Sequence, residues 1–159
     1  MADIEWYKNL AEAEYVNGKW QFEDPDRVEQ LLSFKVKTVI NTLFDDVGDA
    51  IEIYNQHAKS RPQISCLPIS DTYSNSLAGF VILLETSQVK LLRKGQCLEI
   101  YSINISGHNT RTKIIHKLNP CYDALGSLMW NTSDKNLINE DIIVKLIMEE
   151  LVKAVAANK

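Results

Sequence analysis

The chain has 159 residues, a formal net charge of −4, and ordinary globular proportions of apolar (45%) and charged (24%) residues. A chain of this length is close to the commonest domain size and can bury one core without disulfides or a structural metal. We therefore expect a single domain over residues 1–159. The acidic balance argues against attraction of the whole protein to nucleic acid or anionic lipid, although it leaves room for a local basic patch.

The cysteines and the N-terminus indicate a cytoplasmic protein. Cys66, Cys97 and Cys121 are widely spaced and include no CxxC pair, so they fit neither a disulfide framework nor a zinc site. The N-terminal sequence MADIEWYKNLAEAEY is acidic and aromatic, unlike a secretory signal. The longest apolar run, residues 77–84, is too short to span a bilayer, so we expect no membrane partner.

Two helices are expected before the strands. Residues 4–16 are predicted to form a short helix that ends at Asn17-Gly18. A second start signal follows at Asp24-Pro25-Asp26, which offers an N-cap, a proline at the first helical position and an acid for the helix dipole. From there the apolar periodicity predicts one long helix to about Ala58.

Residues 63–130 change to the two-residue period of strands. AGFVILLE predicts a buried strand, and QVKLLRKGQCLEIYSINIS predicts a hairpin with a type II′ turn at Gly95-Gln96. TKIIHKL, ended by Asn119-Pro120, and YDALGSLMW are further expected strands. Asn139 then caps a helix running to about Ala156. The predicted fold class is α+β: N-terminal helices (one long), an antiparallel sheet of five to six strands, and a C-terminal helix packed on the sheet.

The hairpin turn fixes which side chains share a face of the sheet. It pairs Lys90 with Tyr101, and we expect the next strand to place Ile115 opposite Tyr101. This register turns three residues of that strand toward the core: Ile114, His116 and Leu118. A slip of one residue would bury Arg111 and Lys113, so we reject it.

The other face of these strands then mixes aliphatic, aromatic and basic side chains. Its expected members are Lys90, Tyr101, Ile103, Ile105, Arg111, Lys113 and Ile115. An apolar centre with a polar rim is typical of a protein interface. Basic groups around an aromatic ring can instead bind nucleic acid or phosphate, although one tyrosine is sparse for that role. The remaining alternative is that a helix of the same chain covers this face.

The C-terminal helix is apolar over more of its circumference than one contact needs. Its stripe of Ile143, Ile147 and Leu151 is extended by three further candidate contact residues: Val144, Met148 and Val152. A helix of this kind touches two partners, which are either two layers of its own domain or another subunit. Glu150 lies at the edge of the stripe, as a solvated carboxylate or as the partner of a buried Lys or His.

Three weaker clusters are better explained without chemistry. Asp45, Asp49 and Glu52 share one side of the long helix, where a solvated face opposite an apolar stripe explains them better than a metal site, and His57 points elsewhere. His116, Cys121 and Asp123 lack the context of a thiol nucleophile. SGHNTRTK, which contains His108, could hold an anion but lacks P-loop spacing.

No complete catalytic, cofactor or metal signature is present, so we expect no enzyme, no cofactor and no metal. The leading interpretation is a non-enzymatic cytoplasmic interaction module, acting as a regulator, adaptor or inhibitor of another protein and forming a homodimer. The alternative is binding of a nucleic acid or a phosphate ligand by five residues: Lys90, Tyr101, His108, Arg111 and Lys113.

Overall fold

The structure is a computed structural model that describes residues 3–7, 15–16, 19–20, 25–71, 76–122 and 127–157. Its contacts form two compact units, residues 1–35 and 36–159, and the boundary between them falls inside the long helix. The expectation of one domain over the whole chain stays a prediction.

The first unit contains a short helical turn, residues 4–7, and a small hairpin. Strands β1 (Tyr15–Val16) and β2 (Lys19–Trp20) pair antiparallel, with Tyr15 opposite Trp20. The predicted helix over residues 4–16 is therefore wrong at its C-terminal end, and residues 8–14 lie outside the described ranges. The physical reason is that Tyr15, Val16 and Trp20 are aromatic or β-branched residues, which favour strands.

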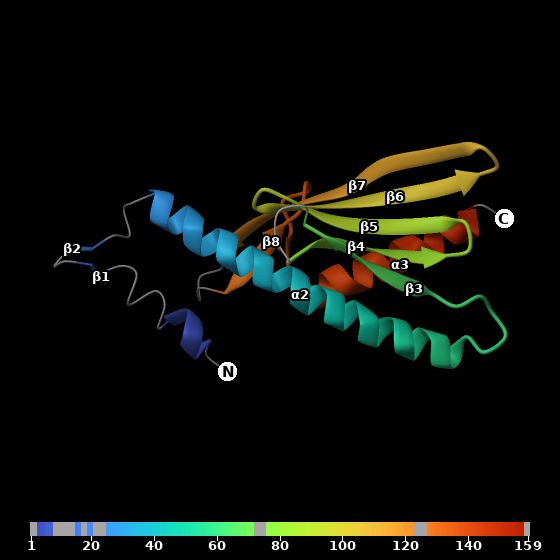
Figure 1. The fold of residues 1–159 in the computed structure, drawn as a ribbon, viewed down its shortest axis with the longest axis horizontal. Coiled ribbons are helices and arrows are strands. Elements are labelled where there is room, and N and C mark those ends of the chain that lie inside the picture. Colours follow the sequence, from blue (N-terminus) through green and yellow to red (C-terminus); the bar gives the residue numbers. More distant parts are fainter. Residues whose placement is uncertain are drawn as a thin grey trace. The chain divides into compact units, whose positions relative to one another are not determined.

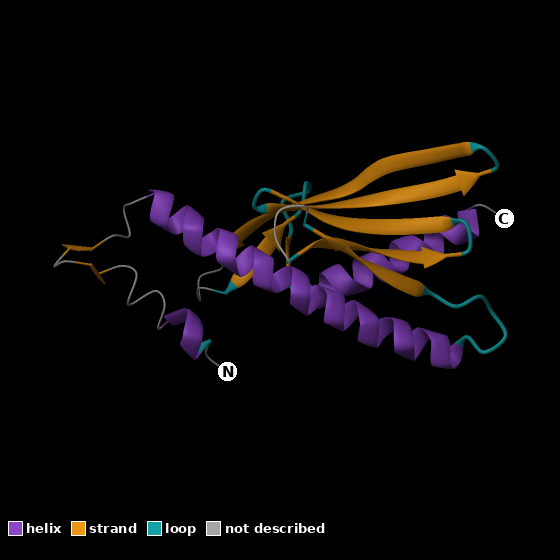
Figure 2. Cartoon of the chain, viewed as in Figure 1, coloured by secondary structure: helices purple, strands orange, loops and turns teal. Residues whose placement is uncertain are grey.

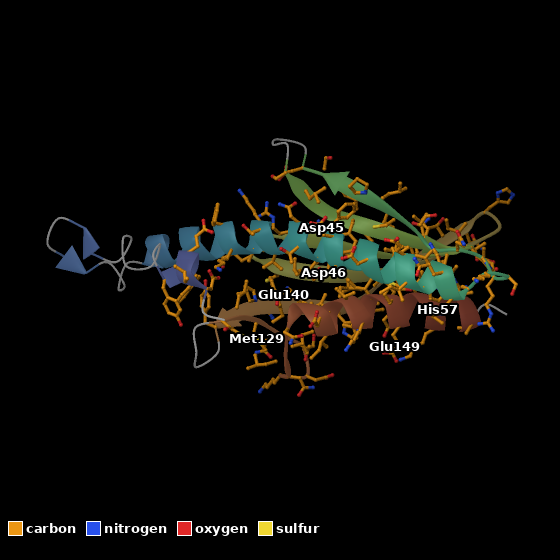
Figure 3. The ribbon with its side chains drawn as sticks, turned by 90° about the horizontal axis from the view of Figure 1, so that it is seen from below. Asp45, Asp46, His57, Met129, Glu140 and Glu149 are labelled. Atoms are coloured by element: carbon orange, nitrogen blue, oxygen red, sulfur yellow. The ribbon has the colours of Figure 1, made fainter. Side chains whose placement is uncertain are left out.

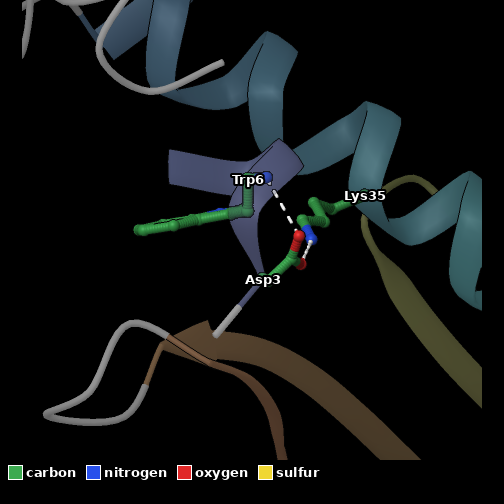
Figure 4. A network of polar contacts seen from close by, with 3 residues as sticks. All are labelled: Asp3, Trp6 and Lys35. Carbon is green, nitrogen blue, oxygen red and sulfur yellow. Dashed lines mark hydrogen bonds and ion pairs between the residues drawn. The ribbon is translucent and has the colours of Figure 1, made fainter. Parts of the chain in front are cut away.

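Asp3 organises the start of this unit (Figure 4). Its Oδ1 accepts the backbone N–H of Trp6 at 2.9 Å, which is the bond of an N-cap, and its Oδ2 accepts from Lys35 Nζ at 2.6 Å. The bond from Lys35, and then that from Trp6, lowers the pKa of the Asp3 carboxyl below its ordinary value. The Asp3 side chain is 55% exposed, so the ion pair orders the chain locally but adds little stability.

Helix α2 (Pro25–His57) begins and ends where its sequence signals predict. In the part of α2 that belongs to the second unit, the predicted apolar face is buried. Its buried side chains are Val36, Val39, Ile40, Leu43, Val47 and Ile51. Asp45, Asp49 and Glu52 on the opposite side are exposed, as their place on the helix predicts.

The second unit is built around a seven-stranded antiparallel sheet in which each strand pairs with its neighbours in the sequence (Figures 1 and 2). Its strands are β3 (Ser65–Ser70), β4 (Leu77–Leu84), β5 (Ser87–Lys94), β6 (Cys97–Ser106), β7 (Asn109–Tyr122), β8 (Leu128–Asn131) and β9 (Leu137–Ile138). Gly95-Gln96 forms the predicted β5–β6 turn, with Gly95 at a φ of 63°. Lys90 pairs with Tyr101, as predicted.

The strand count exceeds the predicted five to six for two local reasons. β3 contains Pro68, and a proline in a sequence argues against a strand. It is tolerated here because β3 is an edge strand. β9 has only two residues, which is too short to leave a periodic pattern in the sequence. Asn119-Pro120 also does not end β7, which continues to Tyr122 by pairing with β8 after its pairing with β6 has ended.

Helix α3 (Glu140–Ala157) closes the fold on the same face of the sheet as α2. Asn139 Oδ1 accepts the N–H of Ile142 at 3.0 Å, so the predicted N-cap is confirmed. α3 packs against β4, β5 and β6, while Phe44 of α2 places its ring 5.8 Å from that of Phe80 on β4. Figure 3 shows the two helices running side by side. Within the described ranges, neither helix combines the length and the apolar character that a membrane span needs.

The buried apolar side chains of β4, β5, β6 and β7 share the face of the sheet on which these helices pack. We call this the helix face, and its fully or nearly buried members are Phe80, Ile82, Leu84, Val89, Leu91, Leu98, Ile100 and Leu118. Successive strand residues alternate between faces, so the residues between them form the opposite side of the sheet. We call that side the outer face.

Candidate interaction surface

A β-bulge in β7 decides which side chains reach each face. Ile100 on β6 lies opposite His116, but its neighbour Tyr101 lies opposite Ile114, so Ile115 is an extra residue on β7. The predicted pairing of Tyr101 with Ile115 is therefore wrong. Ile114, predicted to face the core, instead points outward and is 54% exposed.

The bulge moves three predicted site residues, Arg111, Lys113 and Ile115, to the other face. Arg111 lies opposite Asn104 and Lys113 opposite Ser102, and these β6 residues alternate with the outer-face residues Tyr101 and Ile103. Arg111 and Lys113 are thus on the helix face, together with Ile115. The sequence argues against this placement, because a side chain on the core face is expected to be buried and both residues are charged. In the structure both stay exposed, because they line an open pocket beside α3.

The outer face keeps four of the predicted residues together: Lys90, Tyr101, Ile103 and Ile105. Ile114 takes the place predicted for Ile115, and Val81, Leu83 and Leu92 of the neighbouring strands continue the apolar surface. None of these eight side chains is buried, and Ile105 is 39% exposed. In the second unit, no helix within the described ranges lies on this face.

Polar contacts order the centre of the outer face. The Tyr101 hydroxyl donates a hydrogen bond to Glu99, and the Lys90 ammonium lies 5.1 Å from the centre of the Tyr101 ring. The bond to Glu99, followed by desolvation, raises the pKa of the Tyr101 phenol. Lys117 lies directly opposite Glu99. Charges of both signs therefore surround one aromatic ring.

The three candidates on α3 have different surroundings. Val144 is 8% exposed and belongs to the core, Met148 is half-buried, and Val152 is 42% exposed. Val152 lines a largely apolar hollow of about 400 Å³ where the C-terminal ends of α2 and α3 meet the β4–β5 turn. The buried stripe of α3 thus packs against the sheet, while Val152 borders a hollow that is also lined by Tyr54 of α2.

The acidic side of α2 does not assemble a metal site within the described ranges, where no group of three or more potential ligands is found. Figure 3 places His57 at the far end of α2 from Asp45 and Asp46. Desolvation is the main reason that the pKa of Asp46 is raised, and Asp141 at the start of α3 is the next contributor. Asp46 is therefore a carboxylate brought close to a second acid by helix packing.

The residues of the conceivable thiol site are not brought together. His116 Nε2 lies 3.8 Å from Glu150 Oε1, so Glu150 faces a histidine rather than only solvent. The Cys121 thiol donates to the carbonyl of Met129 at 3.7 Å. Cys121 is five residues further along the same strand than His116, a separation of about 17 Å. Asp123 lies outside the described residues.

A second hollow, of about 390 Å³, lies between β6, β7 and α3. It is lined by Ser102, Asn104, Arg111, Lys113, Ile115, Glu150, Lys153 and Ala154. Ser102, Asn104 and Lys153 are not predicted from the sequence as site residues. The available signal is that Ser102 and Asn104 alternate with the outer-face residues of β6, so they form a polar stretch of the helix face. His108, at the tip of the β6–β7 turn, is exposed and is not among the lining residues.

Comparison with known proteins adds no identification. No protein-family model matches the chain, and neither a curated protein nor a solved structure is significantly similar to it.

Proposed function

We propose that this chain is a non-enzymatic cytoplasmic interaction module that forms a homodimer through the outer face of its sheet and acts as a regulator, adaptor or inhibitor of another protein. One observation carries the proposal. The outer face exposes a continuous set of large apolar side chains, and no helix of the second unit covers it within the described ranges.

The composition of that face is unusual for a sheet surface in water. Antiparallel sheets with one solvated face commonly place polar residues there. Here β4 presents Val81 and Leu83 outward, and β6 presents Tyr101, Ile103 and Ile105. Contiguous apolar surface bounded by polar residues is typical of protein contact sites.

A second copy of the chain is the favoured occupant because the charges on the face complement themselves. Glu99 supplies a negative charge, while Lys90 and Lys117 supply positive charges nearby. A twofold axis through an isologous interface places the same patch on both subunits, so the Glu99 of one copy can meet a lysine of the other. A second copy of the chain therefore satisfies the charges of the outer face, and a different partner with the opposite charge pattern is not required.

The separation of the basic residues supports a protein partner over a nucleic acid. The alternative function needs Lys90 and Tyr101 to act together with Arg111 and Lys113 on one surface. Lys90 and Tyr101 lie on the outer face, whereas the bulge in β7 turns Arg111 and Lys113 to the helix face.

The test is the solution mass by light scattering, compared between two matched variants. Ile114→Glu introduces a charge on the outer face at a side chain that is 54% exposed, and Ile53→Glu does the same on α2 at one that is 60% exposed. We expect the wild type and Ile53→Glu to have twice the 18.1 kDa mass of the chain, and Ile114→Glu to be monomeric. Circular dichroism checks that both variants fold. A monomeric wild type, or a dimer that Ile114→Glu leaves intact, would refute the proposal.

A further inference from the structure

We propose that the hollow between β6, β7 and α3, here called the β7–α3 pocket, binds a small molecule that carries a phosphate monoester. This goes beyond the proposed dimerisation, which uses the opposite face of the sheet. The lining residues come from both strands and from α3, and the cavity of about 390 Å³ lies within the usual range for small-ligand sites.

The bulge at Ile115 provides the geometry. Arg111 and Lys113 are two residues apart on β7 and so point to the same face, with backbones about 7 Å apart. Two long basic side chains at that spacing can reach the oxygens of one phosphate group from both sides. Without the bulge they would lie on the outer face, and strand bulges are often found where a site needs a side chain to be redirected.

Polar groups on β6 complete the floor of the pocket. Ser102 lies opposite Lys113, and Asn104 lies opposite Arg111. Asn104 is held in place by the hydroxyl of the buried Ser87, which donates to its Oδ1 at 2.9 Å. A hydroxyl and an oriented amide next to two cations match the acceptors of a phosphate group, which forms short charge-assisted bonds with such donors.

The positive charge of these two residues is available to a ligand. Three other basic residues of the described ranges have carboxylate partners: Lys35 lies 2.6 Å from Asp3, Arg93 lies 3.7 Å from Asp71, and Lys153 lies 3.1 Å from Glu149. Arg111 and Lys113 take part in none of the ion pairs found there. A dianionic phosphate supplies the countercharge that the protein itself does not.

The remaining walls indicate what the phosphate is attached to. Glu150, whose carboxylate faces His116, is an acceptor at the α3 side, while Ile115 and Ala154 are apolar. A phosphorylated polyol or similar small molecule offers hydroxyl donors for Glu150 in addition to its phosphate. Nucleic acid fits less well, because backbone binding normally uses a track of several cations, and the third cation of the lining, Lys153, is already paired with Glu149.

The experiment is a ¹H–¹⁵N NMR titration of the full chain with inorganic phosphate and with glycerol 2-phosphate. Lys113→Gln and Lys117→Gln form a matched pair, because they remove the same charge from the same strand on opposite faces. We expect glycerol 2-phosphate to shift the amides of Ser102, Asn104 and Lys113, and to bind more tightly than inorganic phosphate. Lys113→Gln should weaken binding by about fivefold or more and Arg111→Gln/Lys113→Gln by about tenfold or more, with less than about twofold for Lys117→Gln.

Three results would overturn the inference. The first is the absence of pocket shifts in the wild type with either probe up to about 10 mM, which would place any affinity below a useful range. The second is an equal loss of binding in Lys117→Gln, which would mean that phosphate responds only to overall charge. The third is tighter binding of a single-stranded oligonucleotide than of glycerol 2-phosphate through the same amides. Because the variants are judged by chemical shifts, a misfolded variant is recognised in the same spectra, and Arg111→Lys then serves as the milder replacement.

Discussion

The side-chain amide of Asn55 bonds both polar groups of the Ile64 backbone: Oδ1 accepts the Ile64 N–H at 2.9 Å, and Nδ2 donates to the Ile64 carbonyl at 3.1 Å. Ile64 is 3% exposed, so water cannot readily replace these bonds. The contact joins the last turn of α2 to the segment that leads into β3.

We expect Asn55→Ala to lower the free energy of unfolding by about 2–3 kcal/mol, because it leaves a buried donor and a buried acceptor unpaired. Urea denaturation followed by circular dichroism measures this. Gln56→Ala is the control, since Gln56 is the exposed neighbour on the same helix, and it should change stability by no more than about 0.5 kcal/mol. Equal effects of the two substitutions would mean that the Asn55 bonds do not stabilise the fold.

The β4–β5 turn contains a residue in the left-handed region of backbone space. Glu85 has a φ of 54°. For a residue with a side chain, this left-handed conformation costs about 1–2 kcal/mol relative to a backbone conformation with negative φ. Glu85→Gly should therefore stabilise the protein, by about 1 kcal/mol after the greater chain entropy of glycine is subtracted. Thr86→Gly, at the next position of the turn and without a positive φ, should destabilise it. The measurement is the midpoint of thermal unfolding of each variant, compared with that of the wild type. A lower midpoint for Glu85→Gly than for the wild type would contradict the prediction.

Asp46 predicts a pH dependence of a definite sign. Its pKa is raised in the folded protein, chiefly by desolvation and next by Asp141, so the folded state disfavours its charged form. The cost is fully present above the raised pKa, and it disappears as the pH falls below the ordinary pKa of an aspartate. Asp46→Asn should thus raise the melting temperature at neutral pH and lose this advantage in acid.

The control for Asp46 is Glu52→Gln, which removes a charge from the exposed side of the same helix. The measured quantity is the difference in melting temperature between each variant and the wild type, followed from neutral pH to about pH 3. A difference for Asp46→Asn that stays constant with pH, or that matches Glu52→Gln throughout, would show that Asp46 is not the cause.

Local signals were enough to predict much of this fold. Pro25 following Asp24 marks the start of α2, Asn139 marks the start of α3, and Gly95-Gln96 sets the β5–β6 register. Each is a short-range rule in which one or two residues determine the backbone conformation. These signals need no knowledge of the rest of the chain.

The register of β7 could not be predicted in this way. Ile114 and Ile115 are adjacent apolar residues of equal size, so a strict alternation can send either one to the core. The structure sends one to each face by inserting a bulge, which leaves no mark in the residue pattern. The cost of burying Arg111 and Lys113, which decided the predicted register, does not arise because α3 leaves them exposed at the rim of the sheet. Residues of β6 were placed correctly because their turn is local, whereas those of β7 depend on tertiary packing.

Tyr101 allows the order of the outer face to be measured directly. Its hydroxyl donates to Glu99, and this bond favours the neutral phenol, so the pKa of Tyr101 is raised above the ordinary tyrosine value. The bond's contribution to stability is therefore present below the ordinary tyrosine pKa and is lost as the pH rises through the raised value.

Glu99→Gln should return the Tyr101 pKa toward its ordinary value, since it removes both the charged acceptor and the repulsion of the phenolate. A ¹³Cζ NMR titration of labelled tyrosines, with Tyr101→Phe assigning the signal among the six, follows this ionisation. Lys117→Gln, which changes the residue opposite Glu99 but not the bond itself, should affect the Tyr101 pKa less than Glu99→Gln does. If Glu99→Gln leaves the titration of Tyr101 unchanged, the two side chains do not bond in solution, and the ordered centre assigned to the outer face does not exist.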